Sequence, residues 1–438
     1  MPEPALFPPA PQFERGHRYA LDDLVQLSIH RNASLDVARY EAEAVQGLVD
    51  QVESLWLPSA RFNFAATAYD NDLNYKATAY RLVSIDVPIT GGYNITNTAA
   101  IGQILATFGK RTSGLRQAKM YAAIKKLDVL RLQDAVVLDV TTYYHLVLLT
   151  SEIDAILEDT QRRMQVFRQV AGEQNARGSL RVAALDTLQA DFFVSQLEQL
   201  RIAMQAGRRQ AYAALRQSVG VGRDEPLELA DVQLPPALSP GQIQSVYETI
   251  VTGFGRRPEL QMVDLFAKLR SEQVNFAKRA WAPNIAILGS FINVSGNHNT
   301  ILGALDGLVA GLIVDWPIYD PARRARLREA LGLEKAAEAF QRQVEELITL
   351  EIEVTKIDGQ RALATVFRAA RALEIAEEHY DTARQAFSHN LAPASTVATA
   401  LAVDMIARVQ HAAALFGYHQ AQAKLRRVTA DRENVLVN

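Results

Sequence analysis

The chain contains two copies of one sequence pattern, and this duplication constrains its fold more than any other feature. Trp56-Leu57-Pro58 in the first half has a counterpart, Trp281-Ala282-Pro283, in the second. The same offset relates Leu35 to Leu260, with no gap between the matched positions. Because repeated sequence implies a repeated structural unit, both halves should fold to one plan.

The two copies divide the chain into five predicted segments. A proline-rich N-terminal tail precedes repeat one, and a linker containing Pro235, Pro236 and Pro240 separates repeat one from repeat two. Prolines clustered in this way favour irregular structure. In chain order, the tail, repeat one, the linker, repeat two and a C-terminal tail span residues 1–20, 21–230, 231–241, 242–430 and 431–438.

Each repeat begins with a short helix followed by strands. In repeat one, apolar residues recur at spacings of three and four from Leu35, which predicts a helix over 33–56. Alternation around Phe62 and Phe64 then predicts a strand over about 59–69, followed by a polar loop. A second strand is expected over about 93–107, because Pro88 interrupts the alternating run before it. Repeat two has strands predicted at about 284–295 and 305–316.

Two long helices follow the strands. Residues 110–176 contain no proline, and a helix over them would be about 100 Å long. A return helix is predicted over 182–219. Repeat two has a long helix predicted over 321–388 and a return helix over 394–429. Helices of this length must pack lengthwise against others, in coiled-coil fashion.

These elements predict an α+β, mainly α fold, with two internal repeats of helix, strand, strand, helix, helix. Each strand has about the 9–11 residues that cross a bilayer when tilted. Strands in lipid must close into a barrel. Four strands per chain are too few, since bacterial barrels start at about eight. We therefore expect a long helical barrel and a transmembrane β-barrel built jointly by an oligomer. A periplasmic coiled-coil scaffold or adaptor with two ordinary hairpins remains the alternative.

Composition excludes several other classes of function. A net charge of −3 gives no argument for nucleic acid as a partner. The chain has no cysteine, so disulfides and thiol catalysis are excluded. Its histidines lack metal-site spacing, and no nucleotide-binding or nucleophile motif occurs, so we expect no enzyme, no cofactor and no metal. The apolar stretches are too interrupted for a spanning helix, and residues 1–11 do not read as a signal peptide, which suggests a processed chain.

Five motifs, in their order along the chain, resemble the TolC-like outer membrane efflux proteins over residues 19–430. They are Leu21-Asp22-Asp23-Leu24, Trp56-Leu57-Pro58, Phe108-Gly109-Lys110-Arg111, Trp281-Ala282-Pro283 and Ile318-Tyr319-Asp320-Pro321-Ala322-Arg323-Arg324. The resemblance implies a homotrimer in the outer membrane of a Gram-negative bacterium, extending into the periplasm. It implies a passive exit duct that docks a periplasmic adaptor and an inner-membrane pump or ABC transporter. Drugs, proteins and metals all remain possible cargo.

The resemblance also implies that the turns between long and return helices form the periplasmic tip. Adaptor contact is then expected at these turns, although any helical hairpin needs Gly or Pro to turn. The residues concerned are Arg177, Gly178, Ser179, Leu180, Asn390, Leu391, Pro393 and Ser395.

Acidic rings just inside the tip are a further expectation from the resemblance. An oligomer turns one Asp into a ring that favours cations. Asp186 occupies the usual place in repeat one, whereas repeat two has Val397 and Ala400 there. A constriction could instead lie deeper, at Asp191 or Asp404.

Basic residues follow the second strand of each repeat, at Lys110, Arg111, Arg323 and Arg324. Cations near a helix start oppose the helix dipole, so a compensating partner is expected. We interpret them as contacts to inner-leaflet phosphates of the outer membrane, with a solvated helix face as the alternative.

Overall fold

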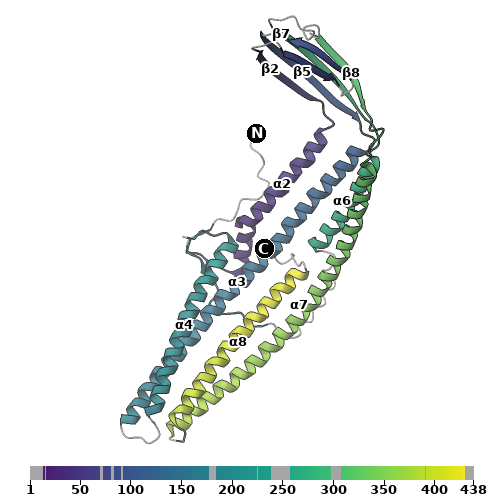
Figure 1. The fold of residues 1–438 in the computed structure, drawn as a ribbon. Helices are drawn as coiled ribbons and strands as arrows, with labels where there is room; N and C mark the ends of the chain where they lie inside the picture. The colour runs from purple at the N-terminus through teal and green to yellow at the C-terminus, as the bar shows by residue number, and fades with distance from the viewer. Residues whose placement is uncertain are drawn as a thin grey trace. The chain divides into compact units, whose positions relative to one another are not determined.

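The computed structural model describes residues 13–14, 16–69, 73–79, 83–89, 92–176, 184–223, 225–237, 257–296, 307–389 and 391–429. The chain divides into two compact units, and each unit draws on both halves of the sequence. Unit 1 comprises Met1–Glu41, Lys126–Met262 and Arg342–Asn438, and unit 2 comprises Ala42–Lys125 and Val263–Gln341. Figure 1 labels the main elements.

Each half of the chain has, among its described elements, a helix, two strands of one sheet, a long helix and a shorter helix, and the first half has two further short strands between its two sheet strands. In the first half these are α2 (Ala33–Ser54), β2 (Ser59–Tyr69), β5 (Gly92–Ala106), α3 (Lys110–Ala176) and α4 (Ala184–Val219). In the second half they are α6 (Pro258–Arg279), β7 (Asn284–Gly296), β8 (Gly307–Asp315), α7 (Arg323–Ser388) and α8 (Ala394–Thr429). The two long helices, α3 and α7, have 67 and 66 residues, so the fold is mostly helical with a small sheet.

Several short elements were not expected from the sequence. Helix α1 (Leu21–Arg31) precedes α2, and β1 (Arg18–Tyr19) pairs in parallel with β6 (Glu228–Leu229). The residues expected to form a polar loop instead include β3 (Leu73–Ala79), which pairs with β4 (Val83–Ile89) in an antiparallel hairpin. Pro88 is tolerated in β4 because both strands of a two-stranded sheet have an unpaired edge.

The sheet of unit 2 combines strands from both repeats. Its order is β2-β5-β7-β8, and each neighbouring pair is antiparallel. The central pairing joins β5 to β7, with Asn97 opposite Asn293. Two separate hairpins therefore become one continuous four-stranded surface.

One face of this sheet is apolar and exposed. The register aligns Phe62, Ala99, Phe291 and Leu308 in one row across the four strands. Phe62 is 68% exposed and Leu308 is 78% exposed. The adjacent row, from Asn63 through Thr98 to Ile292 and Gly307, points to the other face, because side chains alternate along a strand. We call the exposed side the apolar sheet face. Its larger residues are Phe62, Phe64, Ile101, Ile287, Phe291, Leu308, Leu312 and Val314.

The main core of unit 1 gathers α1, α3, α4 and α8. Leu24, Tyr144 and Leu215 are completely buried in this core, which also includes Leu415 of α8. Smaller buried clusters follow along the helices, one of them formed by Met164, Ala190 and Leu401. Long helices bury their apolar stripes by packing against one another along their length.

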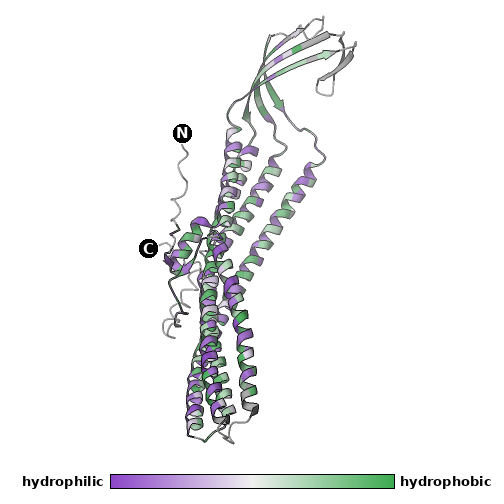
Figure 2. Ribbon diagram, turned by 90° about the vertical axis from the view of Figure 1, so that its left-hand side faces the viewer, coloured by the Kyte–Doolittle hydropathy of each residue, from purple (hydrophilic) through white to green (hydrophobic). Residues whose placement is uncertain are grey.

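The helices carry polar and apolar residues interleaved along their length, as Figure 2 shows. Among the helices of the described residues, none is long and apolar enough to cross a membrane.

We expect Gly220→Ala to destabilise unit 1. Gly220 ends α4 with φ +80°, and a Cβ there would lie 2.2 Å from the Arg31 carbonyl oxygen. Strain of this kind costs about 2 kcal/mol or more, measurable as a lower midpoint of chemical denaturation followed by circular dichroism. Gly207→Ala on the same helix is the control, because its Cβ would meet only Thr150 Cγ2 at 3.9 Å. Equal effects of both substitutions would contradict the argument.

Candidate functional site: a polar network among the long helices

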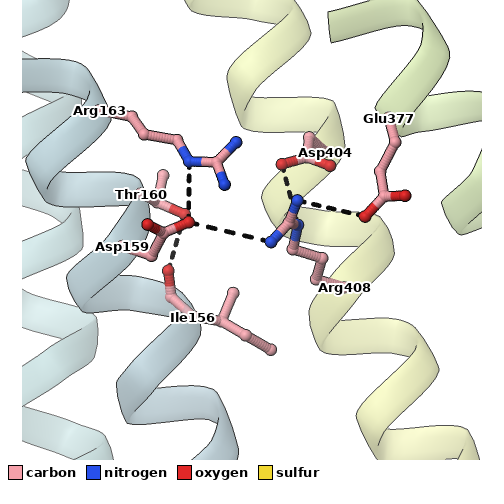
Figure 3. A network of polar contacts seen from close by, with 7 residues as sticks. All are labelled: Ile156, Asp159, Thr160, Arg163, Glu377, Asp404 and Arg408. Atoms are coloured by element: carbon pink, nitrogen blue, oxygen red, sulfur yellow. Dashed lines mark hydrogen bonds and ion pairs between the residues drawn. The ribbon is translucent and has the colours of Figure 1, made fainter. Parts of the chain in front are cut away.

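A network of charged side chains connects α3, α7 and α8 within unit 1. Asp404 and Arg408 are one turn apart on α8, and Asp159 and Arg163 are one turn apart on α3. Residues at this spacing share a helix face. Figure 3 shows both pairs pointing toward the space between the helices, with Glu377 of α7 completing the group.

Arg408 is the centre of the network. Its Nε lies 3.0 Å from Asp404 Oδ2, and its Nη2 lies 3.2 Å from Glu377 Oε1. Its Nη1 lies 3.9 Å from Asp159 Oδ2, which in turn lies 2.8 Å from Arg163 Nε. Three carboxylates therefore share two guanidinium groups, and one arginine links three helices.

Asp404 depends on this pairing because it is only 2% exposed. A buried carboxylate without a partner is strongly unfavourable. One of its oxygens, Oδ1, has no hydrogen-bond partner among the described residues. The guanidinium of Arg408 is thus the main compensation for the buried charge.

The three acidic residues expected at a constriction have different surroundings. Asp404 lies in the network described above. Asp191 of α4 is paired with Arg168 of α3 at 2.7 Å. Asp186 lies in the first turn of α4, and its side chain falls outside the described residues. Sequence reasoning missed Arg408, Glu377 and Asp159, although the i, i+4 spacing of Asp404 and Arg408 was a signal in the sequence.

Of the predicted tip residues, only Leu391, Pro393 and Ser395 of the second turn are described. Arg177, Gly178, Ser179, Leu180 and Asn390 lie outside the described residues. The Leu391 side chain is 80% exposed, while its N–H donates to the Ala386 carbonyl at 2.7 Å. Pro393 is exposed, and Ser395 lies in the first turn of α8. Buried Phe387, Ala394 and Val397 hold this turn from inside.

The predicted basic residues divide into two kinds within unit 2. Lys110 Nζ donates to the Ala282 carbonyl at 2.7 Å, just beyond the end of α6, and burial lowers the pKa of its ammonium group. Arg111 is buried, donates to the Val52 and Glu53 carbonyls at the end of α2 and lies over the Trp56 ring. Cations at helix C-termini are favourable. Arg323 and Arg324 are exposed.

All three tryptophans of the chain lie where helices meet strands in unit 2. Trp56 follows α2, Trp281 follows α6, and Trp316 follows β8; each is about half exposed. The Trp316 indole donates to the Trp281 carbonyl at 3.1 Å. Tyr319 beside them is highly exposed. We call these four residues the aromatic boundary. The motif search found two of the tryptophans but assigned them no role.

Solved structures of outer-membrane channels share this fold. The outer-membrane channel OprN matches with a TM-score of 0.74 at 18% identity, over 95% of this chain and 93% of that chain. VceC from Vibrio cholerae matches with a TM-score of 0.75 at 15% identity, over 93% and 95%. The Campylobacter jejuni channel CmeC matches with a TM-score of 0.74 at 13% identity, over 93% and 85%. No protein-family model and no curated sequence matches the chain.

We expect Arg408→Leu to cost about 3 kcal/mol of unfolding free energy, because it leaves the buried Asp404 carboxylate uncompensated. The double variant Arg408→Leu/Asp404→Leu should recover much of that loss. Arg371→Leu is the control, since the Arg371–Glu374 pair is exposed and should contribute less than about 0.5 kcal/mol. Denaturant titration of each variant provides the measurement. A double variant less stable than Arg408→Leu alone would count against a compensating role.

Proposed function

We propose that the chain is one protomer of an outer-membrane export duct, a passive conduit for substrates delivered by an inner-membrane pump and a periplasmic adaptor. The observation that carries this proposal is the exposed apolar sheet face, in a chain that shares its fold with outer-membrane channels. A contiguous apolar surface of this kind marks contact with lipid or with another protein.

The sheet supports a shared β-barrel. Its outer strands, β2 and β8, each have one unpaired edge within the described chain. Backbone groups in lipid need partners, so the edges must pair with those of other copies. Four strands per copy and about eight or more per barrel require an oligomer, and we propose a homotrimer.

The aromatic boundary supports a membrane interface at one end of the sheet. Tryptophan and tyrosine are enriched where bilayer meets water, because one part of each ring system is apolar and another is polar. Exposed Arg323 and Arg324 follow on the chain and could bind lipid phosphates there. Lys110 and Arg111 are less suited to that role because their cationic groups already bind helix-end carbonyls.

The long helices support a duct wall made from several copies. On α7, Leu347, Leu350, Val354 and Ile357 recur at spacings of three and four, and all are exposed. Such a stripe needs another helix to cover it. We propose that a second copy supplies that helix.

The helix turns and the polar network supply the remaining parts of the proposal. Exposed Leu391 suits contact with an adaptor, together with the other predicted tip residues. The Arg408 network ties α8 to α7 and α3, so it would resist separation of these helices when the duct opens. Asp186 remains a candidate for an acidic ring, whereas Asp191 is already paired with Arg168.

A periplasmic scaffold is less well supported, because such a protein gains nothing from an exposed apolar sheet. Membrane fractionation separates the two functions.

We expect Phe62→Arg to reduce the yield of membrane-inserted oligomer, since an arginine facing the bilayer midplane costs about 2–4 kcal/mol. Asn63→Arg is the matched control, on the same strand but the other face. Yields are read from detergent-extracted membranes after chemical crosslinking. Equal yields of both variants, or a fully soluble parent chain, would contradict lipid contact at this face.

We expect Asp186→Asn to weaken block of single-channel conductance by multivalent cations, because a ring of carboxylates binds them. Asp191→Asn is the control, since Arg168 already neutralises that residue. Planar-bilayer recordings with and without the cation provide the comparison. Unchanged block in Asp186→Asn would reject this residue as the constriction.

A further inference from the structure

The segment that joins the two repeats is held against the helices of unit 1 at three points. We call its described part, residues 231–237, the strap. The Tyr144 hydroxyl donates to Asp231 Oδ2 at 2.7 Å, and the Leu234 N–H donates to Glu152 Oε2 at 3.3 Å. His419 Nε2 lies 2.8 Å from the Pro235 carbonyl oxygen. Two helices, α3 and α8, therefore hold one short segment.

The third contact belongs to a stacked histidine pair. The rings of His145 and His419 are parallel, with an interplanar angle of 1° and centroids 4.6 Å apart. His145 is 6% exposed, and its Nδ1 lies 2.8 Å from the Thr141 carbonyl oxygen. A carbonyl oxygen only accepts hydrogen bonds, so each ring directs one N–H to its own carbonyl. A neutral imidazole has one N–H, which is sufficient for each contact.

The charged groups around the pair do not favour two cations. Asp231 on the strap attracts a proton to His145, whereas Arg426 on α8 repels protons from both rings. The charge of Asp23 of α1 raises the pKa of the neighbouring Tyr144 hydroxyl, and Glu152 of α3 accepts a hydrogen bond from the Leu234 N–H. Burial, followed by the charge of His419, lowers the pKa of His145 to about 4, and burial also lowers the pKa of His419.

We propose that the stacked pair of His145 and His419 is an acid-sensitive clasp that holds the strap when both rings are neutral and releases it when they are protonated. Two imidazolium rings 4.6 Å apart repel each other, and each cation needs water that the buried site does not offer. The rings then separate, and His419 leaves the Pro235 carbonyl. The strap contacts both α3 and α8, so its release would remove one connection between these two helices.

The direction of the pH effect follows from proton binding. In the released state the rings take up protons near the ordinary pKa of 6.5, whereas the clasped state resists protonation. The clasp is thus fully favoured above that value and loses its advantage as the pH falls toward 4. The equilibrium for release should increase at least about tenfold between pH 7.5 and pH 5.

Cysteine labelling of the full chain in detergent can test this, because the chain has no cysteine of its own. Leu234→Cys places a thiol at a strap position that is 7% exposed, and Val232→Cys places one at a position that is 75% exposed. Thiol ionisation changes with pH in both variants. The maleimide labelling rate of Leu234→Cys divided by that of Val232→Cys therefore reports strap release. We expect the ratio to rise at least about tenfold from pH 7.5 to pH 5.

Second-site variants test whether the histidines cause the change. His145→Gln or His419→Gln should reduce the rise of the ratio, because each removes one titrating ring and its repulsion of the other. His411→Gln, earlier on α8, should leave the pH response intact. Arg426→Gln keeps the pair but removes a cation that lowers the pKa of both rings in the clasped state, so the rise of the ratio from pH 7.5 to pH 5 should be smaller. A ratio that is flat from pH 7.5 to pH 5 in the parent chain would overturn the proposal. A pH response that is undiminished in both glutamine variants of the pair would also overturn it.

Discussion

Pairing between β5 and β7 is the constraint on which the sheet depends. Each repeat alone would present a two-stranded hairpin, and a hairpin of that size is at best marginally stable in water. The ladder from Asn94–Gly296 to Ala106–Ile285, with one register shift between Ile104 and Ala106, makes one surface from two repeats. It also aligns the apolar positions of both repeats in common rows, since a shift of one residue would turn every side chain of a strand to the other face. The duplication in the sequence thus becomes one sheet with an apolar side.

The helical unit depends on a different balance, between burial and charge. Its core is apolar over most of its length, with Tyr144 and Leu215 fully buried. The Arg408 network interrupts this pattern with charges that cost desolvation energy. Such a network gives little stability compared with an apolar core, but it makes one arrangement of three helices much better than others. Its position among α3, α7 and α8 therefore suits a point where helices must hold a defined arrangement.

The long helices were predictable from the sequence because their signals are local. Residues 110–176 contain no proline, and α3 runs from Lys110 to Ala176. The break between α1 and α2 was not predictable, because it depends on a distant contact. Asn32 caps α2 through its side-chain oxygen, while its amide donates to the Ser218 carbonyl at 2.7 Å. For the same reason, the sequence could list Arg111 as basic but could not indicate that its guanidinium would meet the end of α2.

The polar contacts between the helices were predictable only in part, both in the candidate site and in the stacked histidine pair, and the histidines show why. His145 and His419 are far apart in the chain, and neither has metal-site spacing. The two rings come into contact only in the folded chain, where α3 and α8 place them together beside the strap. The Arg408 network differs from this pair in what it holds together. It connects α3, α7 and α8 through ion pairs, and none of its residues belongs to the strap. Release of the strap therefore breaks no ion pair of the network, and a chain with both devices can loosen its connecting strap while its charged helix contacts remain in place.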